Sequence, residues 1–185
     1  MGVMDCKTAL MESNGQIEEA IDYLRKKGIA TAKKRGGRIT SEGQVQAYIH
    51  GGGKIGVLVE VNCESDFTGK TEAFTEFVKN IAMQIAASHP LAIDRQGLPS
   101  GAEDKEREIY TIQARDSGKP EKVIEKMVEG KMKKFYSDVC LLAEPYIKNP
   151  DISVQDLLNE MMAKTGENIV IRRFVRFQLG DPDGR

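Results

Sequence analysis

The glycine-rich turn between Gly51 and Gly56 is the first candidate for chemistry, because closely spaced glycines can bind phosphate. Gly51, Gly53 and Gly56 have the spacing of a dinucleotide-binding loop, and Gly53-Lys54 matches the end of a phosphate loop. The first motif needs a helix after the glycines, and the second needs Ser or Thr after the lysine. Alternating apolar residues follow instead, and Ile55 stands after the lysine. We therefore expect no nucleotide or other cofactor to bind at this turn.

The cysteines and histidines are the next candidates. The three cysteines, Cys6, Cys63 and Cys140, are an odd number at wide spacing, and the two histidines, His50 and His89, are far apart. This pattern supports neither a disulfide framework nor a zinc site. It also gives little from which to assemble a catalytic triad. We expect no metal site and no catalytic residue.

The segment Glu64–Lys70 is the stronger candidate, because it follows an expected strand and precedes an expected helix. It should form a turn or a single helical turn at the edge of a sheet, where functional loops concentrate. In one reading Phe67 is a satellite core residue and Ser65 or Asp66 caps a helix. In the other, the Phe67 ring fills a pocket in a partner protein while its polar neighbours fix the register. The residues alone leave both readings open.

Length and composition place these candidates in a small globular protein. The chain has 185 residues, of which 40% are hydrophobic and 30% are charged, and its net charge is -1. These values predict one domain with a small appendage and exclude a large electrostatic field that would attract nucleic acid or a membrane. We expect no membrane span, no secretory signal and a cytoplasmic location.

The start of the chain has helical periodicity. Apolar residues fall at helical spacing in two groups: Cys6, Ala9 and Leu10, then Ile17, Ala20, Ile21 and Leu24. Gly28, behind a basic turn, predicts the end of the second helix. Two helices this short need a third element or a partner to be stable.

A basic segment, Arg25 to Arg38, follows these helices. It has seven basic residues, no acidic one, and ends near Gly36-Gly37. It is either a nucleic-acid-binding arm or a solvated flexible linker. The absence of aromatic residues favours the linker.

Beyond this segment the pattern predicts an α+β core. Alternation in Gln44 to His50 and Lys54 to Asn62 predicts a β-hairpin, and Ile169 to Leu179 predicts a third strand. In that strand Ile169, Ile171, Val175, Phe177 and Leu179 are expected to share a face. Because both of its faces are partly apolar, a central position in the sheet is favoured.

Helices are predicted between the hairpin and the last strand. The first has an apolar stripe, and the others cover Glu103 to Ala114, the stretch after Pro120 that includes Phe135, and Val154 to Met161. The stripe consists of Phe74, Phe77, Val78, Ile81 and Ile85. The order of elements predicts a small, mostly antiparallel three-stranded sheet covered by helices on one face.

Several blocks of sequence, in order along the chain, closely resemble the elongation factor Ts family. They are MDCK at 4–7, AIDYLRKKG at 20–28, YIHGGGKIGVLVEVNC at 48–63, DF at 66–67, GKP at 118–120, CLL at 140–142, ENI at 167–169 and RRF at 172–174. The resemblance covers essentially the whole chain. It implies a ubiquitin-associated-like helical module, here partial, with the basic linker in residues 1–40, followed by an α+β core in residues 41–185.

The resemblance implies a guanine-nucleotide exchange factor, not an enzyme, that acts on the GTPase elongation factor Tu in its GDP-bound and nucleotide-free forms. The family motif that disturbs the GTPase's magnesium and nucleotide site falls on Ser65, Asp66, Phe67 and Thr68. Thr68 replaces an apolar residue of the motif, so its hydroxyl must be solvated or bonded. The alternative function is RNA binding by Arg25 to Arg38, although exchange itself needs no direct nucleic-acid binding.

The resemblance also implies a homodimer. Longer family members have a second copy of the core, which this chain lacks, and short members pair two chains instead. Pairing also fits the expectation that a small sheet needs its exposed face or edge covered.

Overall fold

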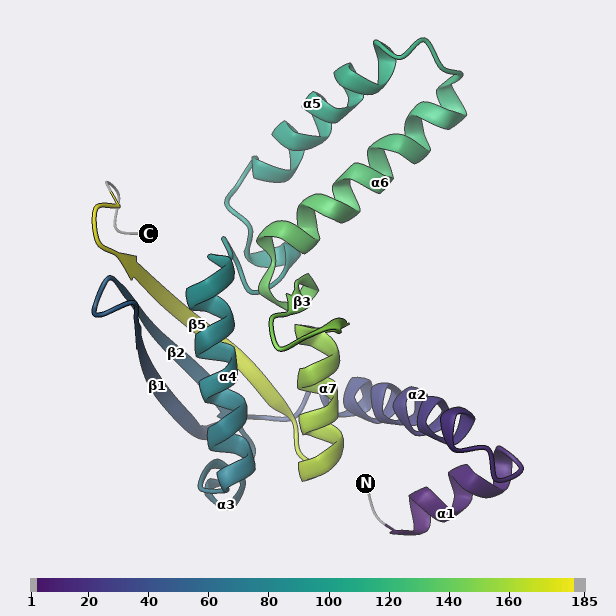
Figure 1. The fold of residues 1–185 in the computed structure, drawn as a ribbon, viewed down its shortest axis with the longest axis vertical. Helices are drawn as coiled ribbons and strands as arrows, with labels where there is room; N and C mark the ends of the chain where they lie inside the picture. Colours follow the sequence, from purple (N-terminus) through teal and green to yellow (C-terminus); the bar gives the residue numbers. More distant parts are fainter. Residues whose placement is uncertain (1–2, 182–185) are drawn as a thin grey trace. The chain divides into compact units, whose positions relative to one another are not determined.

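The computed structural model describes residues 3–181, without the side chains of residues 25, 29 and 31–34 (Figure 1). The chain forms two compact units. One consists of the chain up to Ala86 together with the part from Gln155 onward, and the other runs from Ala87 to Val154. Helices and a small antiparallel sheet confirm the predicted α+β class. Among the residues described, no helix is both long and apolar enough to span a bilayer.

The first two helices are α1, Val3–Glu12, and α2, Ile17–Arg35. They contact each other and bury Ala9 and Ala20 of the predicted apolar faces. Leu10, Ile17 and Ile21 of the same faces remain exposed, so the prediction that these faces are buried is only partly correct. The predicted end at Gly28 is wrong, because α2 continues to Arg35 and most of the expected flexible linker is helical. An internal glycine costs a helix only about 1 kcal/mol, and the alanines, lysines and arginine that follow favour helix. The predicted boundary between module and core at residue 40 stays a prediction.

The sheet of the first unit has the strand order β1-β2-β5, with both pairs antiparallel. The strands are β1, Glu42–His50, β2, Ile55–Cys63, and β5, Ile169–Gln178. The first two confirm the predicted hairpin, and Val57, Val59 and Val61 of β2 are buried on one face. The central strand is β2, so the predicted central position of the last strand is wrong.

A β-bulge in β5 changes which of its residues face the core. Glu60 pairs with Arg173 but Val61 pairs with Ile171, so Arg172 is the extra residue. Because side chains alternate along a strand, one extra residue moves all later side chains to the other face. The predicted shared face is therefore correct for Ile169 and Ile171 and wrong for Val175 and Phe177, which are exposed.

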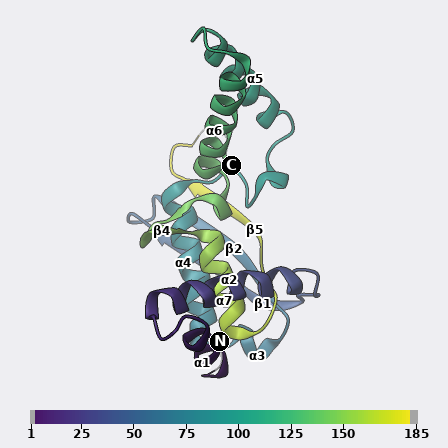
Figure 2. The same cartoon turned by 90° about the vertical axis from the view of Figure 1, so that its right-hand side faces the viewer.

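Helix α4, Glu72–Ser88, covers the buried face of the sheet, and α7, Val154–Thr165, lies beside it (Figure 2). Every residue of the predicted stripe on α4 is buried. Arg176 of β5, only 5% exposed, donates hydrogen bonds from Nε and Nη2 to the carbonyl of Ala86, both 3.3 Å long. A cation at the last turn of a helix stabilises its unpaired carbonyl groups.

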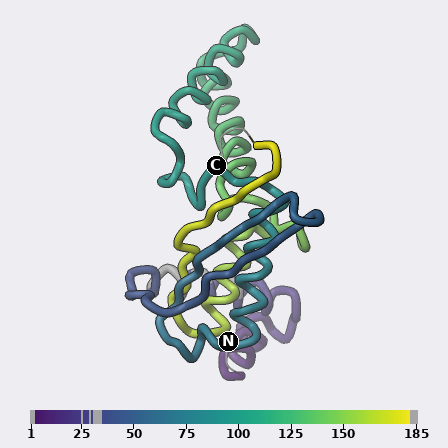
Figure 3. The backbone as a smooth tube through the Cα atoms, turned by 90° about the vertical axis from the view of Figure 1, so that its left-hand side faces the viewer, coloured from purple at the N-terminus to yellow at the C-terminus, as the bar shows by residue number. Residues whose placement is uncertain are grey.

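The opposite face of the sheet faces the viewer in Figure 3, and no helix among the described residues of this unit covers it. Large apolar side chains are exposed there: Val45, Ile49, Leu58, Val175 and Phe177. Their positions in the register place them on the side opposite to Val57 and Val59. Several large apolar side chains exposed together on one face are typical of a protein interface.

The second unit is built on two neighbouring helices, α5, Ala102–Arg115, and α6, Glu121–Val139, which confirm the sequence prediction. Their small core consists of Ala114, Ile124, Val128 and Met132. Two 3₁₀ turns, Arg95–Gly97 and Leu141–Ala143, flank the helix pair. The unit also contains the short antiparallel strands β3, Pro145–Tyr146, and β4, Asn149–Ser153, which the sequence analysis did not predict.

Candidate functional site

The predicted functional segment forms the one-turn helix α3, Asp66–Gly69, directly after β2. Ser65 has extended backbone, and its hydroxyl oxygen accepts a hydrogen bond from the backbone N–H of Thr68 at 3.2 Å. It is therefore the N-cap of the turn, a position that favours serine because the side chain satisfies a free N–H group. Of the two predicted forms, a turn or a single helical turn, the structure has the helical turn, and of the two cap candidates, Ser65 and Asp66, it has Ser65.

Phe67 extends from this turn into solvent with 79% of its surface exposed. The reading of Phe67 as a satellite core residue is therefore wrong. Its neighbour Asp66 forms an ion pair with Lys70, one helical turn later, with 2.6 Å between Oδ2 and Nζ. The hydrogen bond from Lys70 lowers the pKa of the Asp66 carboxyl. Phe67 is thus a free ring beside a negatively charged carboxylate that is already paired.

Thr68 lies on the inner side of the turn and is only 4% exposed. Its backbone carbonyl accepts hydrogen bonds from the N–H and the hydroxyl of Thr71. Its side chain contributes to lowering the pKa of the Glu167 carboxyl, so the polar group that this position adds faces a carboxylate inside the protein. The turn therefore exposes Asp66 and Phe67, while Ser65 and Thr68 hold it from within.

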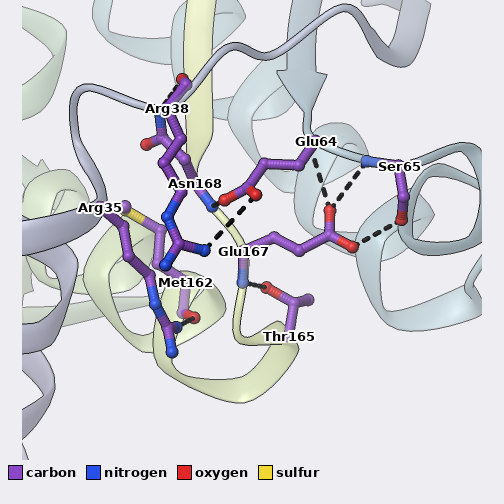
Figure 4. Close-up of polar contacts among 8 residues, drawn as sticks. All are labelled: Arg35, Arg38, Glu64, Ser65, Met162, Thr165, Glu167 and Asn168. Carbon is purple, nitrogen blue, oxygen red and sulfur yellow. Dashed lines mark hydrogen bonds and ion pairs between the residues drawn. The ribbon is translucent and has the colours of Figure 1, made fainter.

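Glu167, between α7 and β5, binds the start of the turn (Figure 4). Its Oε2 accepts hydrogen bonds from the backbone N–H groups of Glu64 and Ser65, both 3.1 Å long. Its Oε1 accepts from the Ser65 hydroxyl at 2.5 Å. Burial would raise the pKa of Glu167, but the hydrogen bonds from Ser65, Thr68 and Glu64 outweigh it and hold this pKa below its ordinary value.

Glu64 makes the reverse contact, since its Oε1 accepts from the backbone N–H of Asn168 at 2.6 Å. We call these four residues, Glu64, Ser65, Glu167 and Asn168, the clasp. Arg38 joins it, with Nη1 3.5 Å from Oε2 of Glu64 and its carbonyl accepting from Nδ2 of Asn168 at 2.9 Å. Figure 4 shows the three segments meeting at this point.

Residues of β1 hold the far end of the turn. Gln44 donates from Nε2 to the carbonyl of Gly69 at 2.6 Å and to the hydroxyl of Thr75 at 2.9 Å. Gly43 has a φ of 137°, and a Cβ built on it would lie 2.1 Å from the carbonyl oxygen of Val61. The sequence alone gives no role to Gly43, Gln44 or Glu167, because no local pattern brings segments this far apart together.

Replacing Gly43 by Ala should destabilise the fold by about 3 kcal/mol, because the added methyl group must move backbone and the φ angle disfavours any side chain. Urea unfolding at neutral pH measures this difference. Gly52→Ala is the matched control, since Gly52 also has a positive φ, 67°, but a Cβ there meets nothing within 4 Å. Equal losses in the two variants would contradict the role of the close approach to Val61.

The lowered pKa of Glu167 gives a pH dependence with a defined sign. The carboxylate stabilises the fold fully above the ordinary glutamate pKa of about 4.3, and this stability is lost as the pH falls through the lower folded-state pKa. Glu167→Gln imitates the protonated carboxyl. The wild type should be more stable than this variant by about 1 kcal/mol at neutral pH, with the difference disappearing in acid. Urea unfolding across this pH range, with Glu160→Gln as an exposed control, measures it.

The glycine-rich turn and the cysteines, the other candidates from the sequence, do not form a chemical site in the structure. Gly51–Gly53 all have positive φ and form the turn of the hairpin, which is followed by a strand as predicted. Burial raises the pKa of the Cys63 and Cys140 thiols, which makes both poorly reactive. Among the residues described, no group of three or more His, Cys, Asp or Glu side chains could hold a metal ion.

Several cations of the basic segment contact the protein itself. Lys27 pairs with Asp5 at 2.9 Å, Arg35 donates to the carbonyl of Met162 at 3.3 Å, and Arg38 joins the clasp. The side chains of Arg25, Lys33 and Lys34 lie outside the described residues. These internal contacts favour a structural role over an RNA-binding arm for this segment.

An exposed aromatic ring on a turn held at both ends is the geometry of an anchor for a protein partner. The comparisons with known proteins give the family. The family model for elongation factor Ts matches residues 4–181. The chain therefore belongs to the elongation factor Ts family, whose members act in translation elongation.

Curated relatives support the same assignment. The chain is 60% identical over 180 residues to elongation factor Ts of Carboxydothermus hydrogenoformans, an alignment that covers 97% of this chain and 83% of the relative. It is 58% identical to elongation factor Ts of Moorella thermoacetica and 57% identical to that of Syntrophobacter fumaroxidans, again over 97% of this chain, with 89% and 90% of the relatives covered.

Proposed function

We propose that this protein promotes the release of GDP from elongation factor Tu by inserting Phe67 near the magnesium and phosphate site of the GTPase. The observation that carries the proposal is the Phe67 ring, exposed on a turn that Ser65 caps and the clasp holds. Among the four motif residues, we assign direct contact to Asp66 and Phe67. We assign support of the turn to Ser65 and Thr68.

The mechanism requires a difference in affinity. The factor must bind the nucleotide-free or distorted GTPase better than the magnesium-GDP form, because a ligand shifts an equilibrium only by its differential affinity. A thousandfold faster release corresponds to about 4 kcal/mol. One buried aromatic anchor commonly contributes about 2 to 4 kcal/mol. Phe67 therefore accounts for much of the effect, and contacts elsewhere contribute the rest.

Release of a fluorescent GDP analogue from purified elongation factor Tu tests the proposal directly. Adding the factor in the presence of excess unlabelled GDP should accelerate the loss of fluorescence in proportion to factor concentration until it saturates. The reaction contains no RNA, so acceleration separates exchange from the RNA-binding alternative. A release rate that is independent of the factor would refute the exchange function.

We further propose that two chains form a homodimer through the uncovered face of the sheet. The support is the set of exposed apolar residues on that face, Val45, Ile49, Leu58, Val175 and Phe177. A two-fold axis brings the same patch of both chains together, so one apolar face on each chain is sufficient to form the interface. The turn at Phe67 lies beyond the β2 end that carries Cys63.

A further inference from the structure

The direction of the Phe67 ring depends on the backbone of its turn. The ring is 79% exposed, so packing against its own chain restrains it little. Helix α3 has only four residues and is too short to be stable alone. The surrounding protein must therefore hold the turn in the orientation that presents the ring.

Glu167 holds the start of the turn in a specific way. Its carboxylate accepts from two consecutive backbone N–H groups, those of Glu64 and Ser65, and from the Ser65 hydroxyl. Because that hydroxyl donates to Glu167, its lone pair is directed to the N–H of Thr68. One carboxylate thus holds the backbone before the turn and also sets the direction of the Ser65 hydroxyl, so that its oxygen can accept from Thr68.

Glu167 lies in the short connection between helix α7 and strand β5. Helix α7 ends at Thr165, Gly166 takes a φ of 79° that favours glycine, and β5 starts at Ile169. The N–H of Glu167 bonds to the Thr165 hydroxyl at 3.3 Å, and Asn168 is tied to Glu64. The carboxylate therefore reaches the turn from a short connection anchored at both ends.

We propose that Glu167 is a positioning residue for nucleotide exchange, which orders the Phe67 turn before the partner arrives. The proposal rests on the exchange function proposed above. Without Glu167 the turn must be ordered when the ring enters the GTPase, and that cost lowers the rate of the step in which the ring acts. In this role Glu167 acts through the turn, so initial docking should change little.

The test is GDP release from elongation factor Tu measured over a range of factor concentrations. Glu167→Ala should lower the maximal rate by about 10-fold, the factor that corresponds to ordering the backbone of one residue. The half-saturating concentration should change less than about 3-fold, because Phe67 is the contact affected and docking uses other surfaces. Glu167→Gln should restore part of the rate, since its amide oxygen still accepts backbone hydrogen bonds.

Two further variants separate positioning from a general loss of structure. Glu160→Ala removes an exposed glutamate from α7 and should leave both kinetic parameters unchanged. Adding Glu167→Ala to Phe67→Ala should have little further effect, because the two residues act through one ring. A full additional loss in the double variant, or a change confined to the half-saturating concentration, would overturn the proposal.

Amide hydrogen exchange in the free factor gives a readout that does not depend on the GTPase. In Glu167→Ala the N–H groups of Glu64 and Ser65 should exchange faster, while those of the central strand β2 should not. Unchanged protection at residues 64 and 65 would refute the positioning role even if exchange activity is confirmed. A wild-type factor that fails to release GDP would instead refute the proposed function.

Discussion

Phe67→Ala should reduce factor-stimulated GDP release from elongation factor Tu by about 30-fold to several hundred-fold at saturating factor. This range corresponds to the loss of about 2 to 4 kcal/mol, which is typical of an aromatic anchor that becomes buried in a partner. The reduction should be in the maximal rate, because the ring acts on the distorted form of the GTPase more than on the initial complex.

The fold should not change in this variant. The ring is mostly in solvent, and the cap, the clasp and the bonds from Gln44 involve other atoms. The unfolding free energy should therefore stay within about 0.5 kcal/mol of the wild type. Leu91→Ala is a suitable control, since Leu91 is also an exposed apolar residue but lies far along the chain from the turn. Equal release rates for wild type and Phe67→Ala would remove the ring from the mechanism.

Periodicity is sufficient to predict the helices of the core, because a buried stripe must repeat with the helical turn. The stripe on α4 and the apolar positions of α6 and α7 follow directly from such spacing, whereas α5 corresponds to the charged segment Glu103 to Ala114. The same approach predicts α2 but places its end incorrectly, at Gly28 instead of Arg35. A single glycine favours a helix end only slightly, and good helix-forming residues on both sides outweigh it.

The bulge in β5 shows where period-two reasoning is insufficient. Arg172 and Arg173 interrupt the apolar alternation, and a bulge at such a point inverts the pattern for the rest of the strand. Nothing local distinguishes a bulge from a polar residue that faces solvent. The inversion has a structural consequence, because it exposes Val175 and Phe177 on the uncovered face and buries Arg176 at the end of α4.

The site was predictable in part. Chemistry alone offers Ser65 or Asp66 as a cap and leaves Phe67 either buried or exposed. The structure selects Ser65 as the cap and places Phe67 in solvent. The clasp could not be predicted, because Ser65 and Glu167 are 102 residues apart. A glutamate next to a helix end has many possible partners, and only the tertiary fold selects one.

Phe177→Glu should convert the proposed homodimer into monomers. The two-fold axis of a homodimer places each substitution twice in the same interface, so two carboxylates would enter an apolar contact beside Leu58 and its symmetry copy. Like charges at an interface cost several kcal/mol, which corresponds to a loss of dimer affinity of about 100-fold or more. Sedimentation equilibrium over a range of protein concentrations measures the change.

The matched control for this experiment is Ile112→Glu, which places the same charge on an exposed apolar position of α5. Ile112 is 54% exposed and Phe177 is 58% exposed, so the two substitutions differ mainly in location. Ile112→Glu should leave the dimer intact. A wild-type protein that sediments as a monomer would refute the dimer itself. A Phe177→Glu variant that stays dimeric would show that the chains pair elsewhere, because an apolar interface cannot accept two unpaired carboxylates without weakening.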